Sequence, residues 1–291
     1  MGMFRALLIV ALAEDSISSG ADDSSSNGEG VAPLVALARD GTDDQKTHAA
    51  RSLANLARGA ANQEAIVQAG GIAPLVALAR GTDEQEAFAA GALAHLALNI
   101  DNHVAIAQAG GITPLVALLL VSLARDGTDE QKTRAAGALA NLAFEDGENQ
   151  EAIAQASGVA PLVALARDGT DEQKANAVGA LLNLATNADL QVTIAQAGGI
   201  APLVALARDG TDEQKARAAG ALRNLAHNLD NQEAIAKAGG IAPLLALARD
   251  GTFEQKTNAA GALNAYQGRL RHKDGSPYVL EDRPGATKID L

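Results

Sequence analysis

Residues 201–215 read APLVALARDGTDEQK, and close copies of this string recur along the chain. Each copy holds one proline, and successive prolines lie 41, 40, 47, 41 and 41 residues apart. They are Pro33, Pro74, Pro114, Pro161, Pro202 and Pro243. A period near 41 residues with helical patterning is typical of α-helical solenoid repeats. A length of 291 residues would by itself suggest two domains. The repetition instead predicts one array of about six units.

The two irregular spacings have identifiable origins. The copy at Arg80-Gly81 lacks the aspartate that separates these two residue types in the other copies. The longest spacing contains five extra residues around Leu119–Leu123 and one near Glu145–Glu148. Five residues add about 1.4 turns to a helix, so we expect a longer second helix in this repeat. Its extra apolar surface at Leu118–Leu123 is a candidate oligomer contact, and a tolerated duplication is the alternative.

Start and stop signals predict three helices in each repeat. The first, residues 231–238, opens with a good N-cap residue and ends at Gly239-Gly240. The second carries Pro243 in its first turn, where the missing N–H leaves no bond unmade. In the preceding copy, Thr211–Gln214 form a capping box that opens the third helix. Residues 215–226 continue it with apolar residues at helical spacing.

The composition limits which residue types can form the core and which classes of function are possible. The chain has no cysteine and no tryptophan and is 2% aromatic, so its core must be built from Ala, Leu, Ile and Val. The absence of cysteine excludes a disulfide scaffold, a thiolate zinc site and a cysteine nucleophile. It favours a reducing compartment, the cytoplasm or the nucleus. A net charge of −12 argues against binding nucleic acid or an anionic membrane through bulk charge. Many of the acids belong to the repeated Asp-Gly-Thr-Asp-Glu turn, where they stabilise helix starts.

No pattern of catalytic or metal-ligating residues stands out. The five histidines are His48, His95, His103, His227 and His272. No two of these histidines lie three or four residues apart, so we expect no metal site. The chain also lacks the phosphate-loop and nucleophile-elbow motifs. These observations predict a protein without enzymatic activity and without a cofactor.

The third helices end on a recurring Ala-Leu-x-Asn-Leu-Ala pattern, seen at residues 138–143, 180–185 and 221–226 and, with Ser52 in the first position, at residues 52–57. With a short first helix that ends in glycine and a second helix that contains proline, this pattern resembles the armadillo repeat over roughly residues 30–265. The resemblance implies an all-α, right-handed solenoid of three-helix repeats whose third helices line a concave groove. It also implies a protein-binding scaffold or adaptor. A structural or assembly module is an alternative within the same class.

One family feature is missing from the sequence. Peptide-binding armadillo proteins carry tryptophan four residues before the asparagine. The chain has glycine there in five repeats and arginine in the first: Arg51, Gly91, Gly137, Gly179, Gly220 and Gly261. The aromatic shelf for lysine side chains is therefore absent, which weakens the alternative that the chain binds cargo as a nuclear-import adaptor does.

Comparison of the repeats with one another locates a candidate binding surface. One column of the third helix varies while its neighbours stay constant: His48, Phe88, Arg134, Asn176, Arg217 and Asn258. The asparagine column lies seven residues further on, on the same helical face: Asn55, His95, Asn141, Asn183 and Asn224. Asparagine matches the donor and acceptor of a peptide unit, so these eleven residues are the predicted peptide-binding site, with the arginines meeting acidic groups.

Simpler explanations exist for both columns. Glu130 and Glu213 precede Arg134 and Arg217 by four residues, a spacing that forms ion pairs along a helix. The asparagines could merely cap the turn into the next repeat. Variation on an exposed face can also be drift.

The two ends of the chain depart from the repeat. Phe4–Ala13 resembles a short secretory signal and is too short to span a bilayer. However, Arg5–Asp15 aligns with Gly179–Asp189, which favours a truncated third helix. Residues 16–30 are rich in Ser, Gly and Asp, as flexible linkers are. The predicted organisation is therefore a truncated helix and linker at 1–30, a solenoid at 31–265 and an irregular tail at 266–291.

Overall fold

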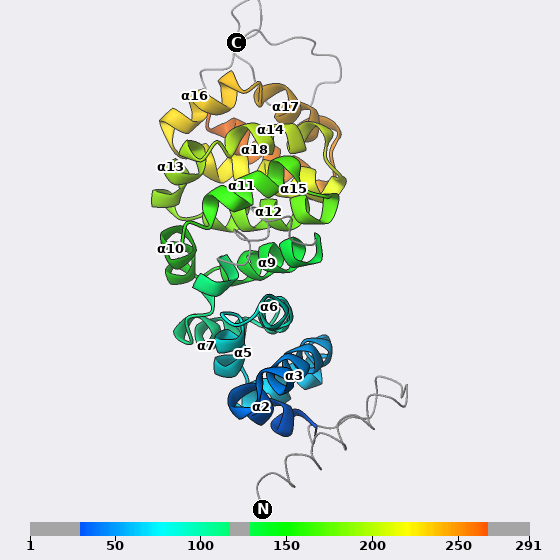
Figure 1. Ribbon diagram of the computed structural model, residues 1–291. Coiled ribbons are helices and arrows are strands. Elements are labelled where there is room, and N and C mark those ends of the chain that lie inside the picture. The colour runs from blue at the N-terminus through cyan, green and yellow to red at the C-terminus, as the bar shows by residue number, and fades with distance from the viewer. Residues whose placement is uncertain (1–29, 117–128, 267–291) are drawn as a thin grey trace, which may run out of the picture. The chain divides into compact units, whose positions relative to one another are not determined.

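The computed structural model describes residues 30–116 and 129–266 (Figure 1). Three predictions fall outside the described residues. They concern the N-terminal helix and linker, of which only residue 30 is described, the insertion at Leu118–Leu123, and the C-terminal tail after Tyr266. The chain divides into two compact units, unit 1 up to Leu118 and unit 2 from Leu119 onward, which we describe separately. Within both described ranges every regular element is a helix, as the sequence predicts.

Unit 1 contains two repeats and the beginning of a third, whose second helix starts at residues 112–116. Its elements are α2 (Val31–Asp40), α3 (Asp43–Leu56), α4 (Ala60–Gln68), α5 (Ile72–Leu78), α6 (Asp83–Leu96), the 3₁₀ turn η1 (Ile100–Asn102) and α7 (His103–Gln108). The third helices α3 and α6 pack against each other.

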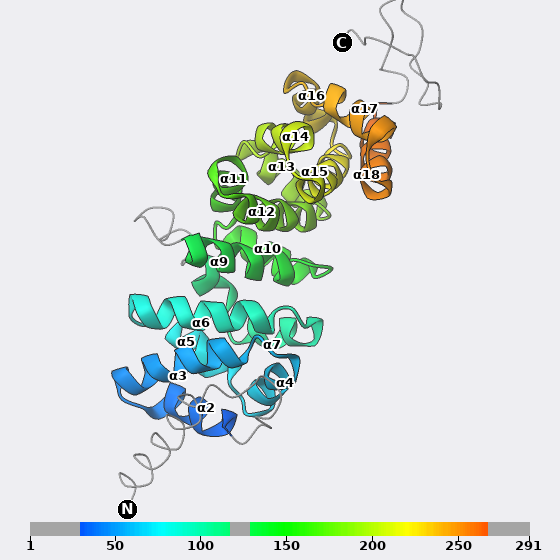
Figure 2. The same cartoon turned by 90° about the vertical axis from the view of Figure 1, so that its right-hand side faces the viewer.

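Unit 2 contains the remaining repeats. Its helices are α9 (Asp129–Leu142), α10 (Gly147–Gln155), α11 (Val159–Asp168), α12 (Asp171–Leu184), α13 (Ala188–Gln196), α14 (Ile200–Asp209), α15 (Asp212–Leu225), α16 (Leu229–Lys237), α17 (Ile241–Asp250) and α18 (Phe253–Asn264). The third helices α9, α12, α15 and α18 follow one another side by side (Figures 1 and 2). Within unit 2, each third helix after α9 therefore packs on that of the repeat before.

The predicted capping boxes are confirmed at the start of five third helices. In α15 the N–H of Gln214 donates to Oγ1 of Thr211 at 3.3 Å, and the N–H of Thr211 donates back to Oε1 of Gln214 at 3.0 Å. The same reciprocal pair opens α3, α6, α12 and α18. Two orphan backbone donors are satisfied each time, which fixes where the third helix begins.

The predicted start of the first helix is wrong by about one turn. Helix α16 begins at Leu229, and Asn228, not Asn231, is its N-cap. The Asn228 side chain accepts from the N–H groups of Asp230 and Asn231. Asn231 is buried instead, and its Nδ2 donates to the carbonyl of Gln191 at 3.2 Å. Local sequence could not separate the two asparagines, because only packing against α13 decides which one is buried.

The core consists of small aliphatic side chains, as the composition predicts. In α15, Ala218, Leu222 and Leu225 are completely buried, and the equivalent positions of α6 and α12 are equally inaccessible. Alanine at these positions lets neighbouring helices approach closely without bulky side chains between them. Each unit thus closes its core by stacking repeats, and no single repeat does so alone.

The departure from the Asn-Leu-Ala pattern after Leu263 has a structural counterpart. Helix α18 ends at Asn264, and Tyr266 lies where the other third helices carry a core leucine. Its ring is buried, and its hydroxyl donates to the carbonyl of Gln232 at 2.9 Å. Burial raises the pKa of Tyr266 to about 12.

Candidate functional site

Four columns of the third helix share one face, which we call the third-helix stripe. In α15 they are occupied by Glu213, Arg217, Gly220 and Asn224. Residues four, seven and eleven positions apart lie above one another on an α-helix. The stripe therefore combines the acidic residue of the capping box, the variable column, the glycine column and the asparagine column.

The asparagine column bonds to the repeat before it. Nδ2 of Asn183 donates to the carbonyl of Ala140 at 2.9 Å, and Nδ2 of Asn224 donates to that of Leu182 at 3.3 Å. These side chains therefore reach backward along the array and do not cap the turn into the next repeat. In the same column Asn141 and His95 are half-buried, and Asn55 is exposed.

The variable column of unit 2 makes the same kind of contact about two turns earlier in the third helix. Nδ2 of Asn176 donates to the carbonyl of Thr133 at 3.2 Å, and Nδ2 of Asn258 donates to that of Ala216 at 3.0 Å. Nη1 of Arg217 donates to the carbonyl of Ala175 at 2.8 Å. The sequence located this column, but the carbonyls that it contacts lie 42 or 43 residues away and were not foreseen.

The glycine column makes room for these contacts. A Cβ at Gly179 would lie 3.1 Å from Nη1 of Arg217, and one at Gly220 would lie 3.2 Å from Nδ2 of Asn258. The next repeat thus covers the glycine with its variable side chain. A tryptophan at this column would displace that side chain, which is a physical reason for glycine here.

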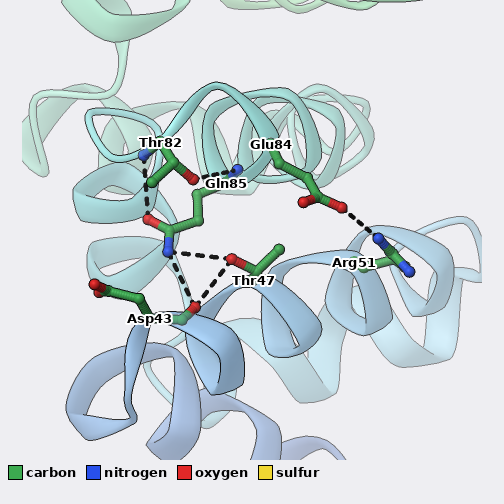
Figure 3. A network of polar contacts seen from close by, with 6 residues as sticks. All are labelled: Asp43, Thr47, Arg51, Thr82, Glu84 and Gln85. Carbon is green, nitrogen blue, oxygen red and sulfur yellow. Dashed lines mark hydrogen bonds and ion pairs between the residues drawn. The ribbon is translucent and has the colours of Figure 1, made fainter.

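Two charged contacts reduce the freedom of the arginines. Arg217 forms an ion pair with Glu213 at 2.6 Å, the contact within one helix that its sequence spacing allows. In unit 1 the Arg51 guanidinium lies 4.8 Å from the ring centroid of half-buried Phe88. Arg51 also forms an ion pair with Glu84 (Figure 3). Arg134 is half-buried on α9.

The most regular contact was missed from the sequence. Nε2 of Gln85 donates to the carbonyl of Asp43 and to Oγ1 of Thr47, each at 3.2 Å (Figure 3). Its Oε1 meanwhile accepts from the N–H of Thr82. Equivalent bonds to the preceding third helix come from Gln173, Gln214 and Gln255. The sequence did contain a signal for this contact. Either glutamate or glutamine can complete a capping box, but all six boxes of this chain contain glutamine.

A second buried column anchors the first helix of each repeat. Its glutamines donate from Nε2 to the carbonyl that ends the preceding third helix, as Gln232 does to Ala226 at 2.9 Å. Gln63, Gln150 and Gln191 repeat the contact. His103 replaces glutamine in one repeat, and its Nε2 lies 2.8 Å from the carbonyl of Ala97. A histidine that donates to this carbonyl has a structural role.

The described residues hold no group of three or more His, Cys, Asp or Glu side chains arranged to bind a metal ion. The half-buried Glu86 stands where five other repeats carry lysine, and burial, reinforced by the Asp83 charge, raises its pKa. No single helix in the same ranges is long and apolar enough to cross a membrane, and one bent pair, α13 with α14, passes by length and composition alone.

Comparison with known proteins places these features in a family. The sequence model of the Armadillo/beta-catenin-like repeat matches residues 148–186 and 187–227. No curated protein sequence matches the chain. Among solved structures, an engineered protein is 36% identical with a TM-score of 0.71, and the match covers 84% of this chain and 97% of that one.

Two designed proteins show the same likeness. A computationally designed armadillo repeat protein for modular peptide recognition is 29% identical with a TM-score of 0.71, over 81% of this chain and 99% of that one. A designed armadillo repeat protein in complex with the peptide (KR)4 is 28% identical with a TM-score of 0.69, over 81% and 99% of the two chains. The repeat pattern, the three-helix units and these matches agree that the chain belongs to the armadillo repeat family and has its α-solenoid fold.

Proposed function

We propose that the chain is a non-enzymatic scaffold or adaptor that holds an extended peptide or partner segment along its third-helix stripe. Armadillo repeats commonly mediate binding to proteins or peptides. The designed relatives described for modular peptide recognition and bound to (KR)4 support the same class of role here.

The observation that carries the proposal is the orientation of the asparagine amides in unit 2. Each of these amides donates a hydrogen bond from Nδ2 to a carbonyl of the preceding third helix, at Asn176, Asn183, Asn224 and Asn258. Within the described residues, no hydrogen bond engages their Oδ1 atoms. The backward contact fixes each half-buried amide, so its oxygen is held ready to accept a hydrogen bond. A row of such acceptors matches the N–H groups of an extended chain.

The spacing of the row suits an extended ligand. Packed helices lie about 8–10 Å apart and a strand advances about 3.3 Å per residue. Successive asparagines would therefore meet every second or third residue of the ligand. The variable column would then contact its side chains.

The import-adaptor alternative receives less support. The glycine column is covered by side chains of the following repeat, at Gly179 by Arg217 and at Gly220 by Asn258. A lysine-binding aromatic shelf cannot occupy the same place. The assembly alternative depends on Leu118–Leu123, which lies outside the described residues.

Selection of a random displayed peptide library on the full chain tests the proposal. We expect enriched peptides whose affinity falls at least about tenfold, or 1.4 kcal/mol, when Asn141, Asn183 and Asn224 are all changed to Ala. Fluorescence anisotropy with the labelled peptide measures the change in affinity. Two peptides of defined sequence, (KR)4 and an acidic peptide of equal length, serve as additional separate probes.

Two controls separate binding from stability. Changing Glu151, Gln155 and Gln196 to Ala alters three exposed residues of the first helices and should leave affinity unchanged. Gln214→Ala weakens the packing of α15 on α12 without touching the stripe. If the asparagine variant binds as tightly as the original chain, the stripe is not the binding surface.

A further inference from the structure

The first described third helix, α3, carries donor positions that the other third helices use on a preceding repeat. In α15 the contacts run from Gln214, Arg217 and Asn224 to backbone carbonyls of α12. The equivalent residues of α3 are Gln45, His48 and Asn55. Among the described residues no third helix precedes α3, so these three side chains have no row of carbonyls to meet.

On the face of the first repeat that would meet such a helix, two side chains are less buried than their equivalents in later repeats. Gln45 is half-buried, whereas Gln85, Gln173, Gln214 and Gln255 are each buried. Asn55 is exposed, whereas Asn183 and Asn224 are half-buried. Nε2 of His48 is buried and has no hydrogen-bond partner in residues 30–116 and 129–266, while Arg217 at the same position reaches a carbonyl at 2.8 Å.

The missing partner must therefore offer the backbone of a third helix. The required acceptors are main-chain carbonyls spaced as in α12, where Asp171, Ala175 and Leu182 accept. A row of carbonyls along an apolar helix of this pattern is the chemistry that the face fits.

The chain itself contains a segment of this pattern outside the described residues. Arg5–Asp15 reads RALLIVALAED and aligns with Gly179–Asp189, GALLNLATNAD. In that alignment Leu7 corresponds to Leu181, which is completely buried in α12. Leu8 corresponds to Leu182, whose carbonyl accepts from Asn224. We propose that residues 5–15 dock on α3 as the C-terminal part of the third helix of an incomplete preceding repeat, with the carbonyl of Leu8 accepting from Asn55. The acceptor positions of Asp171 and Ala175 align before residue 5, so this segment supplies the acceptor for Asn55 and none for Gln45 or His48.

The connection to α2 is long enough for this arrangement. Within unit 2, Leu184 at the end of α12 precedes Ile200 at the start of α14 by 16 residues. The aligned positions at the N-terminus, Val10 and Val31, are 21 residues apart. The intervening residues 16–30 can therefore make the same crossing without the first helix that the other repeats have.

A second copy of the chain is the competing occupant and fits less well. Its last third helix, α18, would have to reach this face from solution. A segment already tethered to α2 also has a high effective concentration at this face. The tethered segment is therefore favoured over a neighbouring molecule.

Engineered disulfides test the contact directly, because the chain contains no cysteine. A Cβ at Gly179 would lie 3.9 Å from Cβ of Ala140 on the preceding third helix, which is near the usual separation of about 3.8 Å in a disulfide. The equivalent pair at the N-terminus is Leu8 with Arg51. We expect L8C/R51C, in the full chain under mild oxidation, to lose both thiols and to remain a monomer by intact mass.

Two further cysteine pairs calibrate this result. The pair A140C/G179C joins two described helices and shows how fully a third-helix contact closes. The pair V10C/R51C moves the first cysteine by about 200° around the proposed helix, so it should retain its thiols. If L8C/R51C stays reduced while A140C/G179C closes, or closes only as a covalent dimer, residues 5–15 do not occupy this face.

Thermal unfolding provides a second measurement that needs no cross-link. Leu7→Asp would place a carboxylate at the position of a buried leucine and should shift Tm downward. Ser19→Asp adds the same charge within the proposed linker and should leave Tm unchanged. Equal Tm values for the two variants would overturn the proposed docking.

Discussion

At the scale of single residues, Gln214 uses both ends of its amide. Oε1 accepts the N–H of Thr211 within its own repeat, and Nε2 donates to the carbonyl of Asp171 in the repeat before. The side chain is almost completely buried. Glutamate could replace the first bond but not the second, because an ionised carboxylate only accepts.

This difference predicts the effect of Gln214→Glu. The variant keeps the capping box but places a carboxylate beside a buried carbonyl, so the free energy of unfolding should fall by about 1–3 kcal/mol. Urea unfolding followed by circular dichroism measures the change. Gln196→Glu, on the exposed face of α13, is the matched control and should alter stability little. An equal loss in both variants would show that the contact with Asp171 is not responsible.

Tyr266 predicts a dependence of stability on alkaline pH. Its folded pKa of about 12 lies above the ordinary value of 10.0, because burial disfavours the phenolate. The neutral ring therefore stabilises the fold below pH 10, and this contribution is lost as pH rises from 10 toward 12. Tyr266→Phe removes that dependence, and because it also removes the hydrogen bond from the hydroxyl to the Gln232 carbonyl, it lowers stability at pH 7 by about 1 kcal/mol. Unfolding curves at several alkaline pH values for both proteins check this, and parallel pH profiles would contradict it.

Sequence comparison among repeats located the stripe residues but not what they touch. The variable and asparagine columns stood out because their neighbours are constant. The carbonyl partners of Asn183 and Asn224 lie 43 and 42 residues away. Such a contact depends on how two helices pack, which no local pattern records. The binding role of these columns remains a prediction.

At the scale of elements, helix ends were predictable wherever one residue type decides them. The threonine box fixed the start of the third helices, and Gly239, with φ of 75°, ends α16. The start of α16 was misplaced because Asn228 and Asn231 are chemically identical and differ only in burial. Tertiary packing thus decided the boundary that sequence left ambiguous.

One glycine column predicts a stabilising substitution. Gly198 has φ of 79° and open space around it, whereas Ser157 at the same position of an earlier repeat has φ of 67°. A residue with Cβ is strained in this left-handed conformation, so Ser157→Gly should raise the free energy of unfolding by about 0.5–1 kcal/mol.

The reverse change, Gly198→Ser, is the matched variant and should lower stability by a similar amount. Chemical unfolding of the two variants measures both effects. If they share the same sign, strain at this turn is not the cause.

At the scale of the whole molecule, the repeat period alone was enough to predict the architecture, because a 41-residue helical unit has few ways to bury its apolar face. Contacts in unit 2 run between adjacent repeats, with α15 packed against α12 and α18, and α12 against α9. Stability in such arrays is a sum of local terms and nearest-neighbour interfaces. A defect in one repeat should therefore weaken its neighbours first.

Hydrogen exchange tests this locality. Leu222→Ala removes a fully buried side chain of α15, at a cost of about 2–5 kcal/mol. We expect amide exchange to accelerate most in α12, α14, α15 and α18 and least in α9. Leu229→Ala truncates an exposed leucine and should change little. Uniform acceleration across unit 2 would mean that its repeats unfold only together.

The glutamine and asparagine side chains that join neighbouring repeats donate to main-chain carbonyls. Every neighbouring repeat supplies these carbonyls, whatever its side chains. A gene that duplicates or loses one whole repeat therefore still encodes a chain in which each glutamine and asparagine meets its acceptor. The array can grow or shrink by a full period in a single genetic step, without a new interface having to evolve. The one-residue changes near Arg80 and Glu145 lie between helices and leave the contacts of Gln85 and Gln173 intact. An insertion inside a third helix would instead shift its donors away from these carbonyls, so the unit of inheritance in this chain coincides with its unit of folding.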